Sequence, residues 1–418
     1  MVSWPDLEIN LTTLTYGGEA LGRLPDGRAV FVPFALPGER VCARVVEEKT
    51  RYLRADLVEV ISPSPQRVEP RCAHYGMCGG CHLQHLLYEG QTAAKREILR
   101  DQLRRLAGFN NPPVKETVSS QPWGYRNHVQ FHLTPEGKLG YHPLRAGVVF
   151  PIQECHLPQP LISQIWPQLE FEGLPGVERI GLRQGDIGDL QLILESSDPR
   201  PPEISIEELD ISVVHVSPAG SLVLAGSPAT TLTVLGRPFQ VSAGSFFQVN
   251  SLMAEKMVAH VLEEARLPAG AVVLDVYCGV GLFSAFLAPH AHRLIAIEAS
   301  PQACDDFVVN LDEFDHVELY QAPAEAVLPT LQATPDLMLV DPPRSGLGRH
   351  ALQALLGLSA PLMVYVSCDP ATLARDAKHL KQGGYQLQQI TPFDMFPQTY
   401  HIESISIWRR DKTSKPLT

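Results

Sequence analysis

Cys368 stands where an apolar stretch typical of a buried strand, residues 364–366, gives way to a helix-forming one, residues 371–375. It lies in the sequence Ser-Cys-Asp-Pro. The amide groups at the start of a helix stabilise negative charge, so we expect the helix field to favour the thiolate form of this cysteine. Cys368 is therefore a candidate nucleophile. The alternative is a buried, inert cysteine, which is the commoner fate of a free cysteine.

A glycine loop and two carboxylates precede that cysteine in the chain. Gly279 and Gly281 follow an apolar run at 272–274 and let the backbone approach a ligand closely. Glu298 ends the next apolar run, where a carboxylate can accept two hydrogen bonds from a ribose diol. Asp341 ends a later run, and the two prolines after it fix the loop. The third glycine of a dinucleotide fingerprint is missing, so the pattern favours S-adenosylmethionine (SAM) over NAD.

A cysteine beside SAM points to methylation at C5 of a pyrimidine. C5 of uracil is a poor nucleophile until a thiolate adds at C6 and generates an enolate. A base must afterwards remove the C5 proton so that the cysteine can leave. Glu403 lies in the stretch that predicts the last strand, and it is the candidate base. The alternative is a glutamate that faces solvent from that strand.

A second group of cysteines has the spacing of an inorganic site. Cys72, Cys78 and Cys81 occur as C-x5-C-G-G-C, and Cys155 follows 74 residues after the third. The two glycines allow the chain to fold tightly, and four thiolates suit either zinc or an iron–sulfur cluster. The spacing alone does not decide between the two.

Three regions must position these residues. Residues 241–418 alternate apolar strands with helices, which predicts an α/β domain with a mostly parallel, doubly wound sheet. Residues 1–62 contain five short strand patterns, which indicate a small OB-like barrel. Residues 63–240 predict a β-rich central domain that carries the cysteine loop. Within it, residues 89–107 predict a helix, which we expect to present Lys95 and four arginines on its polar faces.

Composition bounds the possible partners. The chain has 418 residues, 44% of them hydrophobic, and a formal net charge of −12. The acidic excess is concentrated in residues 165–215 and 294–343, so the remainder is mildly basic and nucleic acid is not excluded. No apolar run approaches the roughly 18 residues of a membrane helix, and the N-terminal residues do not read as a secretory signal. We expect a cytoplasmic protein without a membrane partner.

These motifs together resemble the RNA uracil-C5 (5-methyluridine) methyltransferases that carry an N-terminal TRAM barrel, and the resemblance covers nearly the whole chain. It rests on the cysteine stretch at 72–85, the Phe-Phe-Gln-Val-Asn segment at 246–250 and the Ser-Cys-Asp-Pro sequence. It implies a Rossmann-like SAM methyltransferase domain, a [4Fe-4S] cluster rather than zinc, and a structured RNA substrate. We favour 23S rRNA, with tRNA as the alternative, and expect a monomer.

The resemblance also assigns roles to residues. Cys368 would be the nucleophile and Glu403 the proton-abstracting base. The residues expected to contact SAM are Gln248, Tyr277, Glu298 and Asp341. The expected cluster ligands are Cys72, Cys78, Cys81 and Cys155. The chain departs from the family at Asp369, where many members have asparagine, and at Pro323, where a polar residue is more usual.

The same residues give less support to two rival activities. An amino-group methyltransferase usually has an aromatic residue after the two prolines that follow Asp341, whereas this chain has Arg344. A cytosine-C5 enzyme commonly has a cysteine in that loop, and none is present here. A non-catalytic RNA-binding protein with an iron–sulfur cluster would have no reason to keep Cys368 and Glu403.

Overall fold

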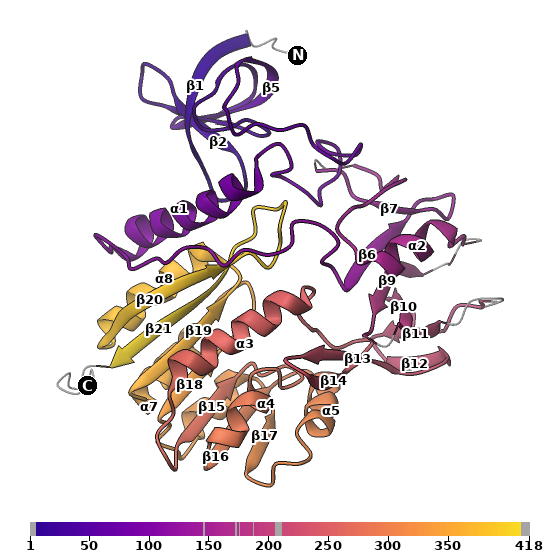
Figure 1. The fold of residues 1–418 in the computed structure, drawn as a ribbon, viewed down its shortest axis with the longest axis vertical. Coiled ribbons are helices and arrows are strands. Elements are labelled where there is room, and N and C mark those ends of the chain that lie inside the picture. The colour runs from indigo at the N-terminus through magenta and orange to yellow at the C-terminus, as the bar shows by residue number, and fades with distance from the viewer. Residues whose placement is uncertain are drawn as a thin grey trace.

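The computed structural model describes residues 6–144, 147–171, 174, 176–186, 188–204 and 211–410. These residues form a closed barrel, two seven-stranded sheets and a two-stranded hairpin. Figure 1 shows the barrel at one end of the molecule, the C-terminal sheet at the other and the central sheet to one side.

The N-terminal strands form the expected barrel. Alternation of buried and exposed side chains produces it, because residues such as Ile9, Leu11, Val41 and Ala43 point inward and their neighbours point to solvent. The strands follow the order β1-β2-β3-β5-β4 and close between β1 and β4. They are β1 (Asp6–Leu14), β2 (Ala20–Arg23), β3 (Ala29–Val32), β4 (Arg40–Glu48) and β5 (Tyr52–Ser62).

The central sheet has the order β12-β11-β10-β9-β6-β7-β8. Its core includes Phe131, Ile180, Leu182 and Leu194, and Trp166 packs on it from a short helical segment. The strands are β6 (His128–Leu133), β7 (Leu139–Tyr141), β8 (Phe150–Pro151), β9 (Val177–Gln184), β10 (Leu190–Ser196), β11 (Ser212–Ser217) and β12 (Gly220–Ala225). The helices beside it are α2 (Pro160–Ile165) and the 3₁₀ turn Trp166–Gln168.

A hairpin of β13 (Ala229–Val234) and β14 (Arg237–Ser242) links the central sheet to the C-terminal region. Its buried residues Leu232, Val234, Phe239 and Val241 belong to the core of the C-terminal sheet. The hairpin is tied there by Asp306, which accepts hydrogen bonds from the backbone and side chain of Ser242.

The C-terminal sheet has the order β17-β16-β15-β18-β19-β21-β20, and its first five strands are parallel, which confirms the doubly wound α/β expectation. β21 runs antiparallel between β19 and β20. The strands are β15 (Val272–Val276), β16 (Arg293–Glu298), β17 (Val317–Gln321), β18 (Leu337–Val340), β19 (Leu362–Ser367), β20 (Tyr385–Phe393) and β21 (Glu403–Arg410). The helices are α3 (Ser251–Ala265), α4 (Ser284–Leu287), α5 (Pro301–Asn310), α6 (Ala324–Val327), α7 (Arg349–Leu358) and α8 (Pro370–Gln382), with 3₁₀ turns at Ala288–His290 and Leu328–Thr330.

Helix α1 (Tyr88–Ala107) confirms the helix expected at 89–107 but corrects its orientation. Lys95, expected on a polar face, is buried, because it lies three and four residues before Ile98 and Leu99 on the face that packs toward the C-terminal sheet. Its ammonium group is paired with Asp394. Three of the arginines on α1 are also ion-paired, Arg96 with Glu116, Arg100 with Glu97 and Arg105 with Asp101.

None of the helices in the described part of the chain is long and apolar enough to cross a membrane.

Candidate active site

The predicted site residues gather at one edge of the C-terminal sheet. Tyr277, Asp341 and Cys368 each come directly after a parallel strand, and Glu298 is the last residue of another. The carboxyl ends of parallel strands meet at the same edge, where ligands of this fold class bind. Glu403 begins β21, which runs in the opposite direction and pairs Ser404 with Ser367, so Glu403 lies at that edge beside Cys368.

The environment of Cys368 differs from the sequence-based expectation. We expected the field of α8 to favour a thiolate, but burial, followed by the carboxylates of Glu403 and Asp341, raises the pKa of the Cys368 thiol to about 12. Arg344 opposes this shift. The helix field is weakened because the Asp369 carboxylate caps the first turn of α8. Without a bound cation, Cys368 is therefore a neutral thiol at pH 7.

Two further carboxyl groups share this environment. Glu403 is buried, and burial followed by repulsion from Asp341 raises its pKa well above the usual value. Burial also raises the pKa of Asp341 to about 7, with a smaller contribution from Asp275. Several acidic groups near one another with little solvent form a region that favours a positively charged ligand.

The glycine loop after β15 leaves room for a ligand. Tyr277, Gly279 and Gly281 all have positive φ angles, of 66°, 55° and 91°. No atom lies within 4 Å of the position that a Cβ on Gly279 would occupy, whereas at Gly281 a Cβ would collide with Leu311 and Phe307. The loop is therefore open on one side and packed against α5 on the other.

Glu298 faces this loop. One carboxylate oxygen accepts a 3.0 Å hydrogen bond from the Gly279 amide, and the other accepts 2.8 Å bonds from the amides of Ala299 and Ser300. These bonds hold the carboxylate at the end of β16, where we expect it to accept hydrogen bonds from a ribose diol.

Gln248 lies in the segment before α3 and is buried. Its backbone carbonyl accepts a 3.0 Å hydrogen bond from the side chain of Asn127. Asn250 caps α3 through Met253 and also donates to Ser120. Among the described residues no hydrogen bond connects the Gln248 side chain to the strand-end residues, so its role at the site remains a prediction.

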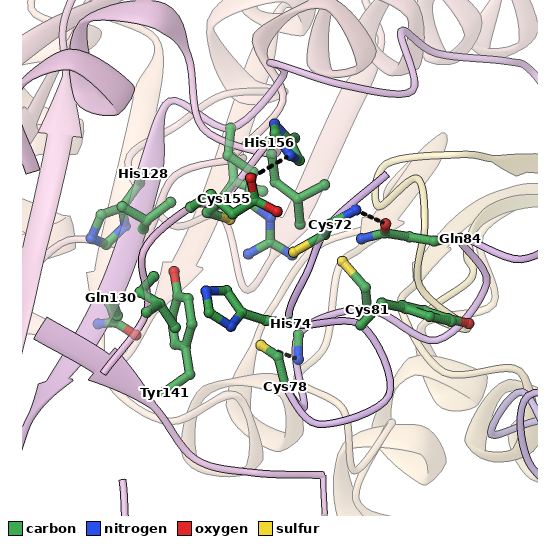
Figure 2. Close-up of a pocket in the computed structure, with 18 residues that line it drawn as sticks. Cys72, His74, Cys78, Cys81, Gln84, His128, Gln130, Tyr141, Cys155 and His156 are labelled. Atoms are coloured by element: carbon green, nitrogen blue, oxygen red, sulfur yellow. Dashed lines mark hydrogen bonds and ion pairs between the residues drawn. The ribbon is translucent and has the colours of Figure 1, made fainter. Parts of the chain in front are cut away.

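The four clustered cysteines line one cavity of about 260 Å³ beneath the loop at 72–84. Figure 2 shows Cys72, Cys78, Cys81 and Cys155 around this space, with Gln84 and Tyr141 nearby. As the side chains stand in the described residues, no three His, Cys, Asp or Glu groups are arranged to hold a single metal ion. None of these four cysteines forms a disulfide bond.

Burial raises the pKa of the cysteines around this cavity, and two neighbouring groups act against that shift. The Gly80 amide donates a 3.3 Å hydrogen bond to Sγ of Cys78. The Arg126 guanidinium also lines the cavity, and its charge opposes the burial that raises the pKa of Cys81 to about 12 and of Cys155 to about 11. The amide of Cys72 donates to Gln84, which holds the loop in shape.

Sequence reasoning missed three residues of the site. Asp275 is buried, accepts a 2.6 Å hydrogen bond from Ser284, and its charge acts on Asp341. The positive charge of Arg344 acts to lower the pKa of both Cys368 and Glu403, against the larger effect of burial. Tyr16 reaches the site from the barrel, and its only signal in the sequence is the Tyr-Gly-Gly turn, which does not indicate what the turn contacts.

Comparisons with known proteins show which families the chain matches. Residues 6–58 match the model of the TRAM domain, and residues 202–335 and 332–410 match that of the tRNA (Uracil-5-)-methyltransferase family. An RNA methyltransferase of Streptomyces avermitilis is 35% identical, with 96% of this chain and 98% of that protein covered. One from Halalkalibacterium halodurans is 33% identical, with 96% of each covered.

A solved structure shares the fold along nearly the whole chain. It is the Pyrococcus abyssi tRNA (uracil-54, C5)-methyltransferase in complex with S-adenosyl-L-homocysteine, with a TM-score of 0.72 and 24% identity. The alignment covers 96% of this chain and 100% of that one.

The fold is that of a SAM-dependent methyltransferase, and the family matches place the chain among the methyltransferases of RNA. Within that class, the chain belongs to the RNA uracil-C5 methyltransferase family and carries its TRAM domain.

Proposed function

We propose that this enzyme methylates C5 of a specific uridine in structured RNA through a covalent bond between Cys368 and C6 of the uracil ring. The observation that supports the proposal most directly is the position of Cys368 and Glu403. The two residues lie at one sheet edge on oppositely directed neighbouring strands, and among the nearby charges the Glu403 carboxylate raises the pKa of the thiol most.

The proposed reaction proceeds in successive steps, and residues of this chain act in the first and the last. The Cys368 thiol releases its proton to solvent, and its sulfur forms a bond to C6 while the C5=C6 π bond breaks, which moves that electron pair onto the C4 carbonyl as an enolate. C5 would then take the electrophilic methyl group that bound SAM supplies, and S-adenosylhomocysteine would be left as the neutral product. Glu403, which must be ionised for this step, removes the C5 proton, the enolate re-forms, and the C6–S bond breaks to release the Cys368 thiolate.

We propose Gln248, Tyr277, Glu298 and Asp341 as the residues that hold SAM. The open side of the Gly279 loop and the oriented Glu298 carboxylate support this assignment. The acidic surroundings of Cys368 support it too, because a sulfonium group would lower the raised pKa values of Asp341 and Cys368.

A cleft beside the nucleophile is the proposed place for RNA. It has a volume of about 1050 Å³ and is lined by the barrel, the cysteine loop, the central sheet and the catalytic region. Residues from all four lie along it, among them Arg54, His82, His132 and His401. A uridine unstacked from its neighbours would reach Cys368 through this cleft.

The RNA target is proposed as 23S rRNA, because the cysteine loop resembles that of cluster-bearing family members. Transfer RNA is the second candidate, since the matching family model and the P. abyssi protein both name tRNA. Nucleoside mass spectrometry of separated rRNA and tRNA, from cells with and without the protein, distinguishes them. Loss of 5-methyluridine from one fraction supports the proposal and names the RNA; unchanged 5-methyluridine in both contradicts it.

We further propose that Cys72, Cys78, Cys81 and Cys155 hold a [4Fe-4S] cluster. An inorganic cluster is larger than one ion, so its ligands stand farther apart than those of a single metal, which suits four cysteines around a shared cavity. The Gly80 amide and the Arg126 guanidinium would stabilise the negative charge of the thiolates. Four protein ligands close the coordination of such a cluster, which favours a structural role.

A further inference from the structure

The barrel of this protein contacts the turn that carries the nucleophile. The hydroxyl group of Tyr16 donates a 2.7 Å hydrogen bond to Oδ2 of Asp369, 353 residues later in the chain. Asp369 directly follows Cys368. A bond of this length between a hydroxyl and a carboxylate is in the range of charge-assisted hydrogen bonds.

Asp369 uses its two carboxylate oxygens for different purposes. Oδ1 accepts 2.9 Å hydrogen bonds from the amides of Ala371 and Thr372, and this caps α8. Oδ2 is left for Tyr16. The Asp369 amide also donates to Oγ of Ser367 on the other side of the cysteine. The turn around Cys368 is thus held by a local hydrogen bond between Asp369 and Ser367 and by a long-range hydrogen bond between Asp369 and Tyr16.

The segment that carries Tyr16 is a tight turn between β1 and β2. The amide of Thr15 donates to the carbonyl of Glu19 at 2.9 Å, and Gly17 and Gly18 have φ angles of 113° and 83°. A Cβ on Gly18 would lie 3.3 Å from Cβ of His82 and 3.5 Å from Cβ of Tyr400. The turn therefore fits closely between the cysteine loop and the segment before Glu403.

Aromatic contacts fix the orientation of the Tyr16 ring. It packs edge-to-face on Tyr400 with ring centroids 5.6 Å apart, and Tyr400 packs on His82 and His401. Burial, followed by the hydrogen bond to Asp369, raises the pKa of the Tyr16 hydroxyl above its usual value, so the hydroxyl keeps its proton and remains a donor.

We propose that Tyr16 is a positioning residue for the nucleophile: through Asp369 it holds the Cys368 turn, so the barrel completes the catalytic centre in addition to any grip on RNA. This inference rests on the proposed function. It explains why Asp369 is tolerated where many family members have asparagine. An amide has one acceptor oxygen and cannot both cap α8 and accept from Tyr16 with the same geometry.

The test compares Tyr16→Phe with the wild-type enzyme and with a matched control, Tyr52→Phe. Tyr52 is in the same barrel and packs on Phe31, and its hydroxyl has no hydrogen-bond partner among the described residues. Steady-state methylation is measured on unmodified 23S rRNA and tRNA transcripts, RNA binding by filter retention, and folding by thermal unfolding. Tyr52→Phe should unfold at the wild-type temperature, and Tyr16→Phe should stay folded and unfold at most a few degrees lower.

We expect Tyr16→Phe to lower kcat by about 10- to 30-fold, the loss expected for one hydrogen bond to a charged group, with KM and RNA binding within about twofold. Tyr52→Phe should match the wild type. In an Asp369→Asn background, the Tyr16 change should have little further effect. A Tyr16→Phe enzyme with wild-type kcat, or one whose loss is entirely in KM and RNA binding, would overturn the positioning role.

A second readout needs neither RNA nor turnover. The rate at which iodoacetamide alkylates Cys368 is followed by peptide mass spectrometry. Tyr16→Phe leaves the Asp369 charge less compensated and should slow the reaction, whereas Asp369→Asn removes that charge and should speed it. Unchanged alkylation in both variants contradicts the coupling. If the wild type methylates neither transcript, the proposed function fails separately, because alkylation still reports whether Tyr16 acts on Cys368.

Discussion

The Nζ atom of Lys95, on α1, donates a 2.5 Å hydrogen bond to Oδ1 of Asp394, 299 residues later in the chain, and both side chains are almost completely buried. Lys95 also donates a 2.9 Å bond to the carbonyl of Phe396. Burial lowers the pKa of the Lys95 ammonium group, and the Asp394 charge opposes this shift. Because Asp394 follows β20, the pair anchors the segment that leads to Glu403.

Removal of this lysine should destabilise the fold. We expect Lys95→Met to lower the free energy of unfolding by about 3–5 kcal/mol, because it leaves the Asp394 carboxylate buried without its cation. Arg105→Ala, which breaks the exposed pair with Asp101, should cost less than about 1 kcal/mol. Urea unfolding measures both. A Lys95→Met protein as stable as the wild type would show that the pair carries little net stability.

Substitutions of the two proposed catalytic residues should have different effects on the reaction. Cys368→Ala should lower methylation by about 10³-fold or more, because the uracil ring is then not activated. Glu403→Gln should form the bond to C6 but not release it, so methylated RNA should stay attached to the protein in a denaturing gel. A Cys368→Ala/Glu403→Gln double variant is the control and should show no attached RNA. Methylation by Cys368→Ala at the wild-type rate would contradict the mechanism.

The raised pKa of Cys368 predicts a pH dependence. Because the thiolate reacts and the thiol pKa is about 12, alkylation of the ligand-free enzyme should keep rising through pH 9 and 10. The alkylation rate of a free cysteine derivative, whose thiol pKa is about 8.5, should level off in the same pH range.

Ligand charge should shift that profile. Sinefungin, a SAM analogue with a positively charged amine, should lower the thiol pKa and move the profile to lower pH. S-adenosylhomocysteine, which has no sulfonium charge, should move it less. Equal profiles with both ligands would show that the proposed SAM site does not face Cys368.

The cysteine cavity predicts the metal content. Protein purified without oxygen should be brown and contain iron and acid-labile sulfide in equal amounts, and Cys155→Ser should lose both. Cys42→Ser, in β4 of the barrel, is the matched control and should keep them. Colourless wild-type protein that contains zinc would contradict the cluster assignment.

The strand-edge part of the site was predictable because it follows from chain direction. A run such as 337–340 must be buried in a parallel sheet, so the residue after it, Asp341, lies at the ligand-binding edge. The same logic located Glu298 and Cys368, whereas Tyr277 came from the family resemblance alone. The barrel was predictable from alternation, since strands of period two with turns between them have few other ways to bury one face.

Long-range electrostatics and domain contacts were not predictable in the same way. The thiol pKa depends on burial and on Glu403 and Asp341, which are distant in sequence, whereas the helix after Cys368 is a local feature. We predicted a polar face for Lys95 because the residue is charged, although it lies four residues before Leu99 and so shares the buried face of the helix. The hairpin at 229–242 shows alternation, but alternation does not indicate which sheet the hairpin packs against.

The insertion of β21 between β19 and β20 constrains when this enzyme can become active. Until residues 403–410 have left the ribosome, β19 has an open edge and β20 has no partner strand in the sheet. The nucleophile, the glycine loop and the barrel are all synthesised earlier. A nascent chain therefore carries the proposed nucleophile without its proposed base, and under the proposed mechanism it acquires catalytic competence only when the strand that begins with Glu403 closes the sheet.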